Sequence, residues 1–203
     1  MIASNSKQII DRKKEIIDAV NIMFDEMDYQ DISMKTISEH ISIARSSLYC
    51  YYKSKEEIML DILKDNYIKF LNEIINAVKN KKNLANKITD IFLNNTRLLK
   101  IISVHLTDIE THVSNQSLVQ FKQPFVKIFS DLKNTFISSY KNTSISDIET
   151  IINSILMLTH SLYPMIHPTD NQIKAMDEVG MSYCKDSHSF CLNYLNLIFL
   201  KLN

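Results

Sequence analysis

Residues 33–55 read SMKTISEHISIARSSLYCYYKSK, and this stretch is the most informative part of the sequence. Ser33 is placed to cap a short helix, and a brief turn at residues 42–44 separates that helix from a second one over residues 45–51. Residues 7–27 come before them and place most of their apolar side chains on one helical stripe. The sequence therefore predicts a long helix followed by two short helices around a tight turn.

The same stretch carries a chemical signal, because no acidic residue lies between Glu39 and Glu56. The basic and aromatic residues of that interval are Arg45, Tyr49, Tyr51, Tyr52, Lys53 and Lys55. A basic and aromatic face without carboxylates is what contact with nucleic-acid phosphates requires. A short helix that begins at Arg45 has the size to enter a major groove. Periodicity alone also fits two short helices in an ordinary bundle.

The composition predicts an all-α protein. The chain of 203 residues has one glycine and three prolines, too few for hairpins or for glycine-rich phosphate loops. Its formal net charge is zero, so any binding of nucleic acid depends on a local patch. Three cysteines and the lack of a secretory pattern favour the cytoplasm, and no stretch is apolar for long enough to span a bilayer.

The rest of the chain reads as a series of further helices. A capping box at Ser54–Glu57 opens a long helix that ends near residue 79, and a second box at Ser146–Glu149 opens a helix that ends at Pro164. Other helical patterns cover residues 83–98, 100–112, 116–140 (entered or kinked at Pro124) and 183–200, with an irregular stretch before the last. The domain boundary is expected in the first of these helices, which gives domains at residues 1–55 and 56–203.

Residues 37–58, ISEHISIARSSLYCYYKSKEEI, resemble the helix-turn-helix of the TetR family of transcriptional regulators. Residues 16–38 resemble that family's first helix and the start of its second. The resemblance implies a three-helix DNA-binding domain and a larger helical domain for ligand binding and dimerisation. It also implies a repressor that a small molecule releases from a palindromic operator. The chain departs from the family pattern at Ser42 and Ser46, where glycine is frequent, and at Ala44, whose side chain cannot cap a helix.

The resemblance also implies which residues contact DNA. They are Ser33, Met34, Lys35, Arg45, Ser46, Ser47, Tyr49, Tyr51 and Lys55. Leu48 and Tyr52 are implied to pack inside the domain.

The resemblance further implies a homodimer that forms through two helices of the second domain, residues 147–163 and 183–200, and the sequence is compatible with this. Their apolar stripes consist of Ile151, Ile152, Ile155, Leu158 and Leu162, and of Phe190, Tyr194, Leu197 and Ile198. A core within one chain is the alternative explanation for the same stripes. An effector pocket is expected among residues 83–166, but composition does not single out its lining residues.

Other kinds of site receive less support from the sequence. Cys184, His188 and Cys191 would share a face of a helix and are suitable ligands for zinc, but no fourth ligand is evident, so no metal or cofactor is expected. No nucleophile elbow, phosphate loop or metalloprotease motif is present, so no catalytic residue is expected. A helical interaction protein that has lost operator binding is the alternative function. Retention of Arg45, Lys53 and Lys55 argues against it.

Overall fold

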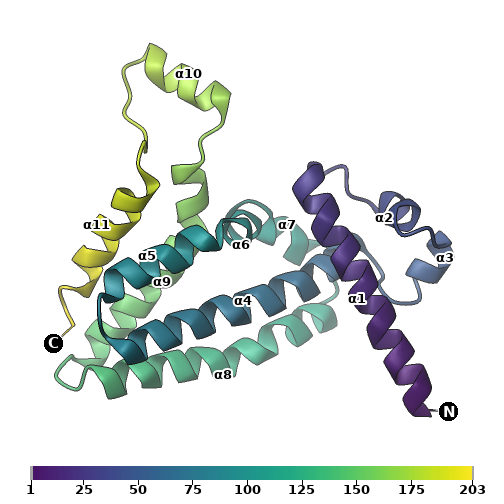
Figure 1. Cartoon of the computed structure of the whole chain (residues 1–203), viewed down its shortest axis with the longest axis horizontal. Helices are drawn as coiled ribbons and strands as arrows, with labels where there is room; N and C mark the ends of the chain where they lie inside the picture. Colours follow the sequence, from purple (N-terminus) through teal and green to yellow (C-terminus); the bar gives the residue numbers. More distant parts are fainter. Residues whose placement is uncertain (1, 203) are drawn as a thin grey trace. The chain divides into compact units, whose positions relative to one another are not determined.

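A computed structural model describes residues 2–202 of the chain, with side chains from Lys7 onward. Within that range the secondary structure is helical and includes no strand, which confirms the predicted all-α class. The chain forms two compact units: residues up to 65 together with 108–122, and residues 66–107 together with those from 123 onward. Figure 1 shows the helices of both units along the chain. No helix within residues 2–202 is long and apolar enough to cross a membrane.

The first unit contains the helix-turn-helix. Its helices are α1 (Ile2–Glu26), α2 (Met34–His40), α3 (Arg45–Leu48), the beginning of α4 (Lys55–Asn80), the end of α7 (Leu106–Thr111) and the first turns of α8 (Asn115–Ser139). The core of this unit includes Ile16, Val20, Met23, Ile32, Ile37, Leu48, Ile58 and Ile62. Ile16, Val20 and Met23 belong to the stripe predicted over residues 7–27, whereas Ile9, Ile10 and Ile22 of that segment are exposed. Burial of this core holds the short helices against α1 and α4.

The turn between α2 and α3 takes the geometry for which glycine is usual. The Ile43 N–H donates to the Ser38 carbonyl at 3.0 Å and the Ser42 N–H to the Glu39 carbonyl at 3.3 Å, which is a Schellman closure of α2. Ser42 has φ 54°, in the left-handed region, as its place in the turn demands. Ala44 precedes α3 without a side-chain cap, as the sequence indicated.

Helix α3 is shorter than predicted, because it ends at Leu48 and not near Tyr51. The Cys50 and Tyr51 amides donate to the carbonyls three residues before them, at 3.1 and 3.0 Å. These bonds tighten the chain into a turn after the single helical turn of α3. The turn carries Tyr52 into the core, where its side chain is 3% exposed.

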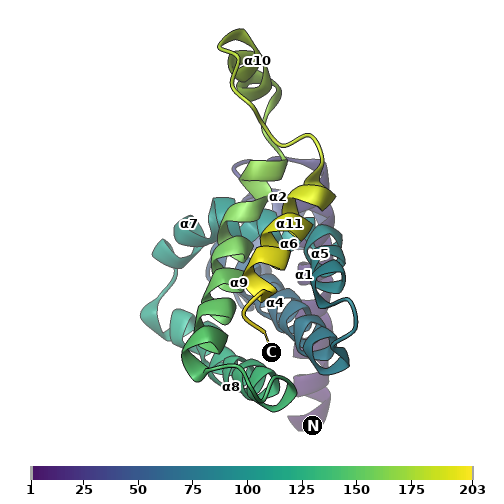
Figure 2. The same ribbon diagram turned by 90° about the vertical axis from the view of Figure 1, so that its left-hand side faces the viewer.

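The second unit contains the remaining helices. They are the later part of α4, α5 (Leu84–Asn94), α6 (Thr96–Lys100), the π-helical turn η1 (Ile101–His105), the start of α7 (Leu106–Thr111), most of α8 (Asn115–Ser139), α9 (Ile145–Ile166), α10 (Asp170–Glu178) and α11 (Ser187–Phe199). Figure 2 shows α11 between α5 and α9, and it contacts both. Aromatic side chains link the helices of this core, with ring centroids 5.2 Å apart for Tyr67 with Phe125 and for Phe70 with Phe92.

Several predicted boundaries in the second unit were wrong. The break expected at residue 99 lies at Asn95, and α9 runs past Pro164 to Ile166. Helix α9 begins at Ile145, two residues before the helix start that the box predicts, because Ser144 and not Ser146 caps it by accepting the Asp147 N–H at 3.1 Å. The stretch after α9 is not irregular throughout, since Thr169 and Gln172 form a capping box that opens α10. The last helix begins at Ser187 and not at Tyr183, because Asp186 caps it by accepting the Ser189 N–H.

Candidate nucleic-acid interface

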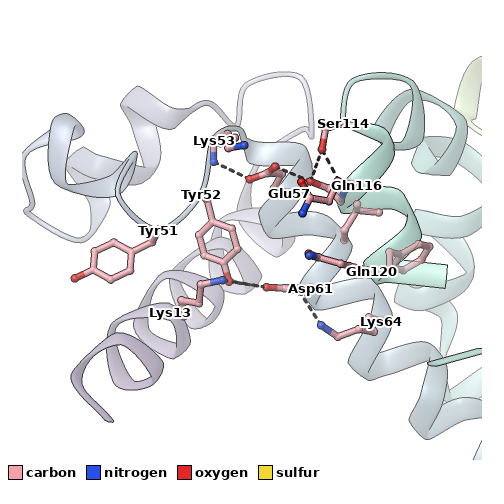
Figure 3. A pocket seen from close by; sticks show the side chains of 13 residues that line it. Lys13, Tyr51, Tyr52, Lys53, Glu57, Asp61, Lys64, Ser114, Gln116 and Gln120 are labelled. Atoms are coloured by element: carbon pink, nitrogen blue, oxygen red, sulfur yellow. Dashed lines mark hydrogen bonds and ion pairs between the residues drawn. The ribbon is translucent and has the colours of Figure 1, made fainter. Parts of the chain in front are cut away.

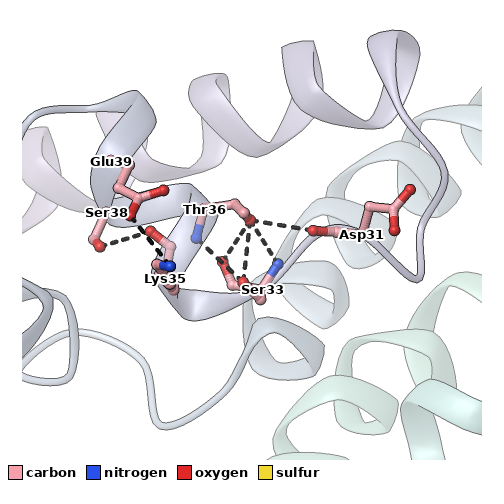
Figure 4. Close-up of polar contacts among 6 residues, drawn as sticks. All are labelled: Asp31, Ser33, Lys35, Thr36, Ser38 and Glu39. Carbon is pink, nitrogen blue, oxygen red and sulfur yellow. Dashed lines mark hydrogen bonds and ion pairs between the residues drawn. The ribbon is translucent and has the colours of Figure 1, made fainter.

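The N-terminus of α2 is held by reciprocal capping. The Ser33 hydroxyl accepts the Thr36 N–H at 3.2 Å, and the Thr36 hydroxyl accepts the Ser33 N–H at 2.9 Å (Figure 4). Lys35 on the first turn is exposed, with its ammonium 3.9 Å from the Glu39 carboxylate. Met34 is 7% exposed and packs in the core, so little of this residue is accessible from outside.

Helix α3 presents one buried and one exposed face. Leu48 is fully buried and anchors the helix, whereas Arg45, Ser46 and Ser47 are exposed. Arg45 donates from Nη2 to the Tyr49 hydroxyl at 3.1 Å, and its guanidinium carbon lies 5.6 Å from the Tyr49 ring centroid. The exposed face therefore offers an oriented guanidinium with donors to spare and two hydroxyls, groups that read base edges and bind phosphates.

The segment after α3 is tied to α4 by a buried tyrosine (Figure 3). The Tyr52 hydroxyl donates to Asp61 at 2.9 Å, and Lys64 binds the other oxygen of that carboxylate at 2.8 Å. Burial, and then the Asp61 carboxylate, raises the pKa of Tyr52 well above its usual value. Tyr52 thus stays a protonated donor and holds the segment that follows α3.

Lys55, at the start of α4, is already engaged within the first unit. Its ammonium donates to the Tyr29 carbonyl at 2.9 Å and lies 4.1 Å from the Tyr29 ring centroid. An ammonium has three donors, so two remain for a phosphate. Lys55 therefore has a structural role besides the DNA contact that the sequence implies.

Glu57 does not complete the predicted capping box. Its own amide donates weakly to the Ser54 hydroxyl at 3.4 Å, but its carboxylate accepts the N–H of Lys53 at 2.8 Å and not that of Ser54. The second carboxylate oxygen accepts the Ser117 hydroxyl at 2.9 Å. Sequence reasoning missed Ser117, because no local pattern relates two positions that are sixty residues apart.

The structure thus brings the implied contact residues into one unit. Helices α2 and α3 contact each other and carry Met34, Lys35, Arg45, Ser46 and Ser47. Ser33 caps α2, Tyr49 and Tyr51 lie in the segment that follows α3, and Lys55 is the first residue of α4. Leu48 and Tyr52 are buried, in agreement with the packing roles implied for them. Asp61, which orients Tyr52, was not predicted, because nothing in its helical surroundings distinguishes it from a solvated charge.

The face proposed for a metal does not form. Cys184 lies before the first residue of α11, so it cannot share a helical face with His188 and Cys191. His188 instead lies 3.8 Å from Asp90, and burial raises the pKa of the fully buried Cys191 thiol to about 11. Within residues 2–202, no three His, Cys, Asp or Glu side chains are grouped to hold a metal ion.

Comparison with known proteins identifies the class of this protein as a helical bacterial transcription regulator. Residues 16–62 match the family described as bacterial regulatory proteins, tetR family, and residues 64–185 match the tetracyclin repressor-like C-terminal domain. The second match alone spans more than half of the chain. The chain therefore belongs to the TetR family of DNA-binding transcriptional regulators.

A solved structure supports the same fold. It is the crystal structure of a transcriptional regulator of the TetR/AcrR family from Thermobifida fusca YX-ER1, with a TM-score of 0.55 and 15% sequence identity. The match covers 90% of this chain and 97% of that one. No curated protein matches the sequence significantly.

Proposed function

We propose that the chain is a cytoplasmic, non-enzymatic repressor that binds a palindromic operator as a homodimer and is released by a small molecule. Residues 1–55 carry DNA binding in this proposal, and residues 56–203 carry dimerisation and effector binding. The observation that carries it is the exposed face of α3. This face presents Arg45, Ser46 and Ser47, Leu48 anchors the helix in the core, and the sequence has no acidic residue between Glu39 and Glu56. That arrangement suits a helix that enters the major groove.

The proposed DNA contacts fall into two groups by chemistry. Arg45, Ser46, Ser47 and Tyr49 lie on or beside the exposed face of α3, which favours base reading. Ser33, Lys35, Tyr51 and Lys55 suit phosphate contacts that set the register of the protein on the duplex. No metal or cofactor enters this function.

Dimerisation in this proposal uses another face of α9 than the one expected from the sequence, whereas on α11 it keeps the exposed part of the expected stripe, which includes Leu197. Ile151, Ile152, Ile155, Leu158 and Leu162 are at most 8% exposed and belong to the core of their own chain. Apolar side chains left at the surface include Met157 of α9, 68% exposed, and Leu197 of α11, 67% exposed. Since apolar side chains at such exposure favour burial against a partner, we place the dimer seam on these outer faces.

Release follows from a difference in operator affinity between two conformers. Helix α4 runs from Lys55 to Asn80 without a break and belongs to both units, so it is the natural lever. An effector that favours a conformer whose two α3 helices no longer match the half-sites lowers the affinity for the operator. An effector that abolishes operator binding while leaving the distance between the α3 helices unchanged would contradict this mechanism.

The test is a fluorescence-anisotropy titration of the purified protein with its own upstream intergenic DNA and with a random duplex, over a range of salt concentrations. We expect tight, salt-dependent preference for one palindromic segment. Equal affinity for both duplexes, from folded dimer free of ligand, would overturn the proposal.

A further inference from the structure

The Glu57 side chain bridges the segment that follows α3 and the first turn of α8. One carboxylate oxygen accepts the Lys53 N–H, and the other accepts the hydroxyl of Ser117 in the first turn of α8. Lys53 lies directly after the buried Tyr52, in the segment that leaves α3. A single side chain thus links two parts of the chain that are far apart in sequence.

The contact to Ser117 is part of a directed chain of hydrogen bonds. The Ser117 amide donates to the Ser114 hydroxyl at 3.1 Å, and the two hydroxyl oxygens are 2.8 Å apart. A hydroxyl has one proton, so when Ser117 donates to Glu57, Ser114 is the donor to Ser117. The hydrogen bonds therefore run from Ser114 to Ser117 to Glu57, and the Lys53 amide donates to the same carboxylate. They connect the N-terminal cap of α8 to the segment that follows α3.

The hydrogen bonds of Glu57 lie beside a polar cavity, where they can open and close. These residues line a polar cavity of about 310 Å³, together with Asp61, Gln116 and Gln120 (Figure 3). Glu57 and Ser117 are only partly buried, so water can replace either partner when the contact opens. The contact is therefore suited to switching rather than to holding the fold.

Helix α8, which carries Ser117, belongs partly to each of the two units. Residues 115–122 belong to the first unit, and residues 123–139 of the same helix belong to the second. Pro124 has no N–H for the Gln120 carbonyl, which loosens the helix just after the segment that carries Ser117. The first turns of α8 can thus change direction while the rest of the helix stays folded.

We propose that Glu57 is a positioning residue that makes DNA affinity depend on the first turn of α8. The Ser117–Glu57–Lys53 linkage is closed in the DNA-binding form and open in the released form. This inference rests on the proposed function and adds to it the contact that relays the state of α8 to the exit of α3. By linkage, DNA binding must then also stabilise the first turn of α8.

The test uses the full-length protein and the variants Ser117→Ala, Ser117→Thr and Ser138→Ala. Threonine keeps the hydroxyl, and Ser138 lies at the other end of α8, where it donates to the carbonyl of Thr135. We expect Ser117→Ala to weaken binding to the upstream duplex by about threefold to tenfold, the effect of one such hydrogen bond. Ser117→Thr and Ser138→Ala should bind as the wild type does.

Hydrogen exchange separates positioning from a merely structural role. In the wild type, DNA should slow exchange in residues 115–121, and Ser117→Ala should abolish that protection. In the DNA-free protein, Ser117→Ala should speed exchange in residues 51–55, which include the Lys53 amide. Unchanged affinity and exchange in Ser117→Ala would overturn the inference. A wild type without preference for its upstream DNA would overturn the proposed function instead, and exchange at residues 51–55 would still decide whether the linkage exists.

Discussion

At the scale of single residues, Arg45 is the side chain expected to read sequence. It is exposed at the N-terminus of α3 and oriented by the Tyr49 hydroxyl. Arg45→Ala should therefore weaken operator binding by roughly 1–3 kcal/mol and leave binding to random DNA nearly unchanged. Anisotropy titrations with both duplexes measure this, with Lys174→Ala on the exposed face of α10 as a control for lost charge. Equal losses on the two duplexes would contradict a base-reading role.

Lys55 should affect DNA binding and stability together. Lys55→Ala should weaken binding about equally on all sequences and reduce the salt slope by about one unit. It should also lower the free energy of unfolding by about 1 kcal/mol, because the hydrogen bond to Tyr29 and the contact with its ring are lost. Urea unfolding measures the second effect. Lys35→Ala is the matched control, since Lys35 is 70% exposed and should change affinity alone.

At the scale of elements, the turn between α2 and α3 stores strain at Ser42. Its φ of 54° costs a residue with a Cβ more than it costs glycine. Ser42→Gly should therefore raise the free energy of unfolding by about 1 kcal/mol, measured by urea denaturation. Ser146→Gly, in the regular first turn of α9, should do the opposite. A loss of stability in Ser42→Gly would show that the serine side chain matters more than the strain.

The three thiols differ in their exposure to solvent. Cys50 is exposed and Cys184 is partly exposed, whereas Cys191 is buried and its pKa is raised. Ellman's reagent should label Cys50 and Cys184 in the folded protein and Cys191 only after unfolding. Cys50→Ser and Cys184→Ser assign the reactive thiols. A metal held by Cys184 and Cys191 would instead protect both until a chelator is added.

Local sequence signals predicted the ends of helices well where a single cap or turn residue stands at the boundary. Ser33 at the start of α2 is one such residue, and Ser42 in the turn after α2 is another. Local signals failed where two candidate caps stand close together, as with Ser144 and Ser146, or where a short polar helix such as α10 buries no side chain. At α10 the box of Thr169 and Gln172 is itself a local signal, but a short polar helix has no apolar stripe to accompany it.

At the scale of the whole molecule, the prediction concerns assembly. Met157→Glu and Leu197→Glu should each convert the dimer into monomers, because a charge would be desolvated in the proposed seam. Operator affinity should fall at least about tenfold, since one half-site is then lost. Sedimentation velocity measures the first effect. Val126→Glu, on a residue of α8 that is 75% exposed, is the control. A stable dimer in both seam variants would contradict the placement of the interface.

Tertiary structure is also where the sequence was least informative. Periodicity showed that Ile155 and Leu162 face something apolar, but it did not distinguish the core of one chain from a seam between two. The same limit applies to Glu57, whose spacing from Ser54 fits a capping box although its carboxylate binds Lys53 and Ser117. Sequence patterns indicate which side chains need a packing or hydrogen-bond partner, and the tertiary structure determines which partner each of them contacts.

The shortness of α3 has a consequence for how the regulator responds to its own abundance. A reading helix of four residues gives each half-site few contacts, so a lone subunit holds DNA weakly and two subunits must act together. While dimers are scarce, operator occupancy then scales with the square of the subunit concentration, and a twofold rise in expression gives about a fourfold rise in occupancy. Operator occupancy would therefore rise steeply with the concentration of this protein, even in the absence of an effector.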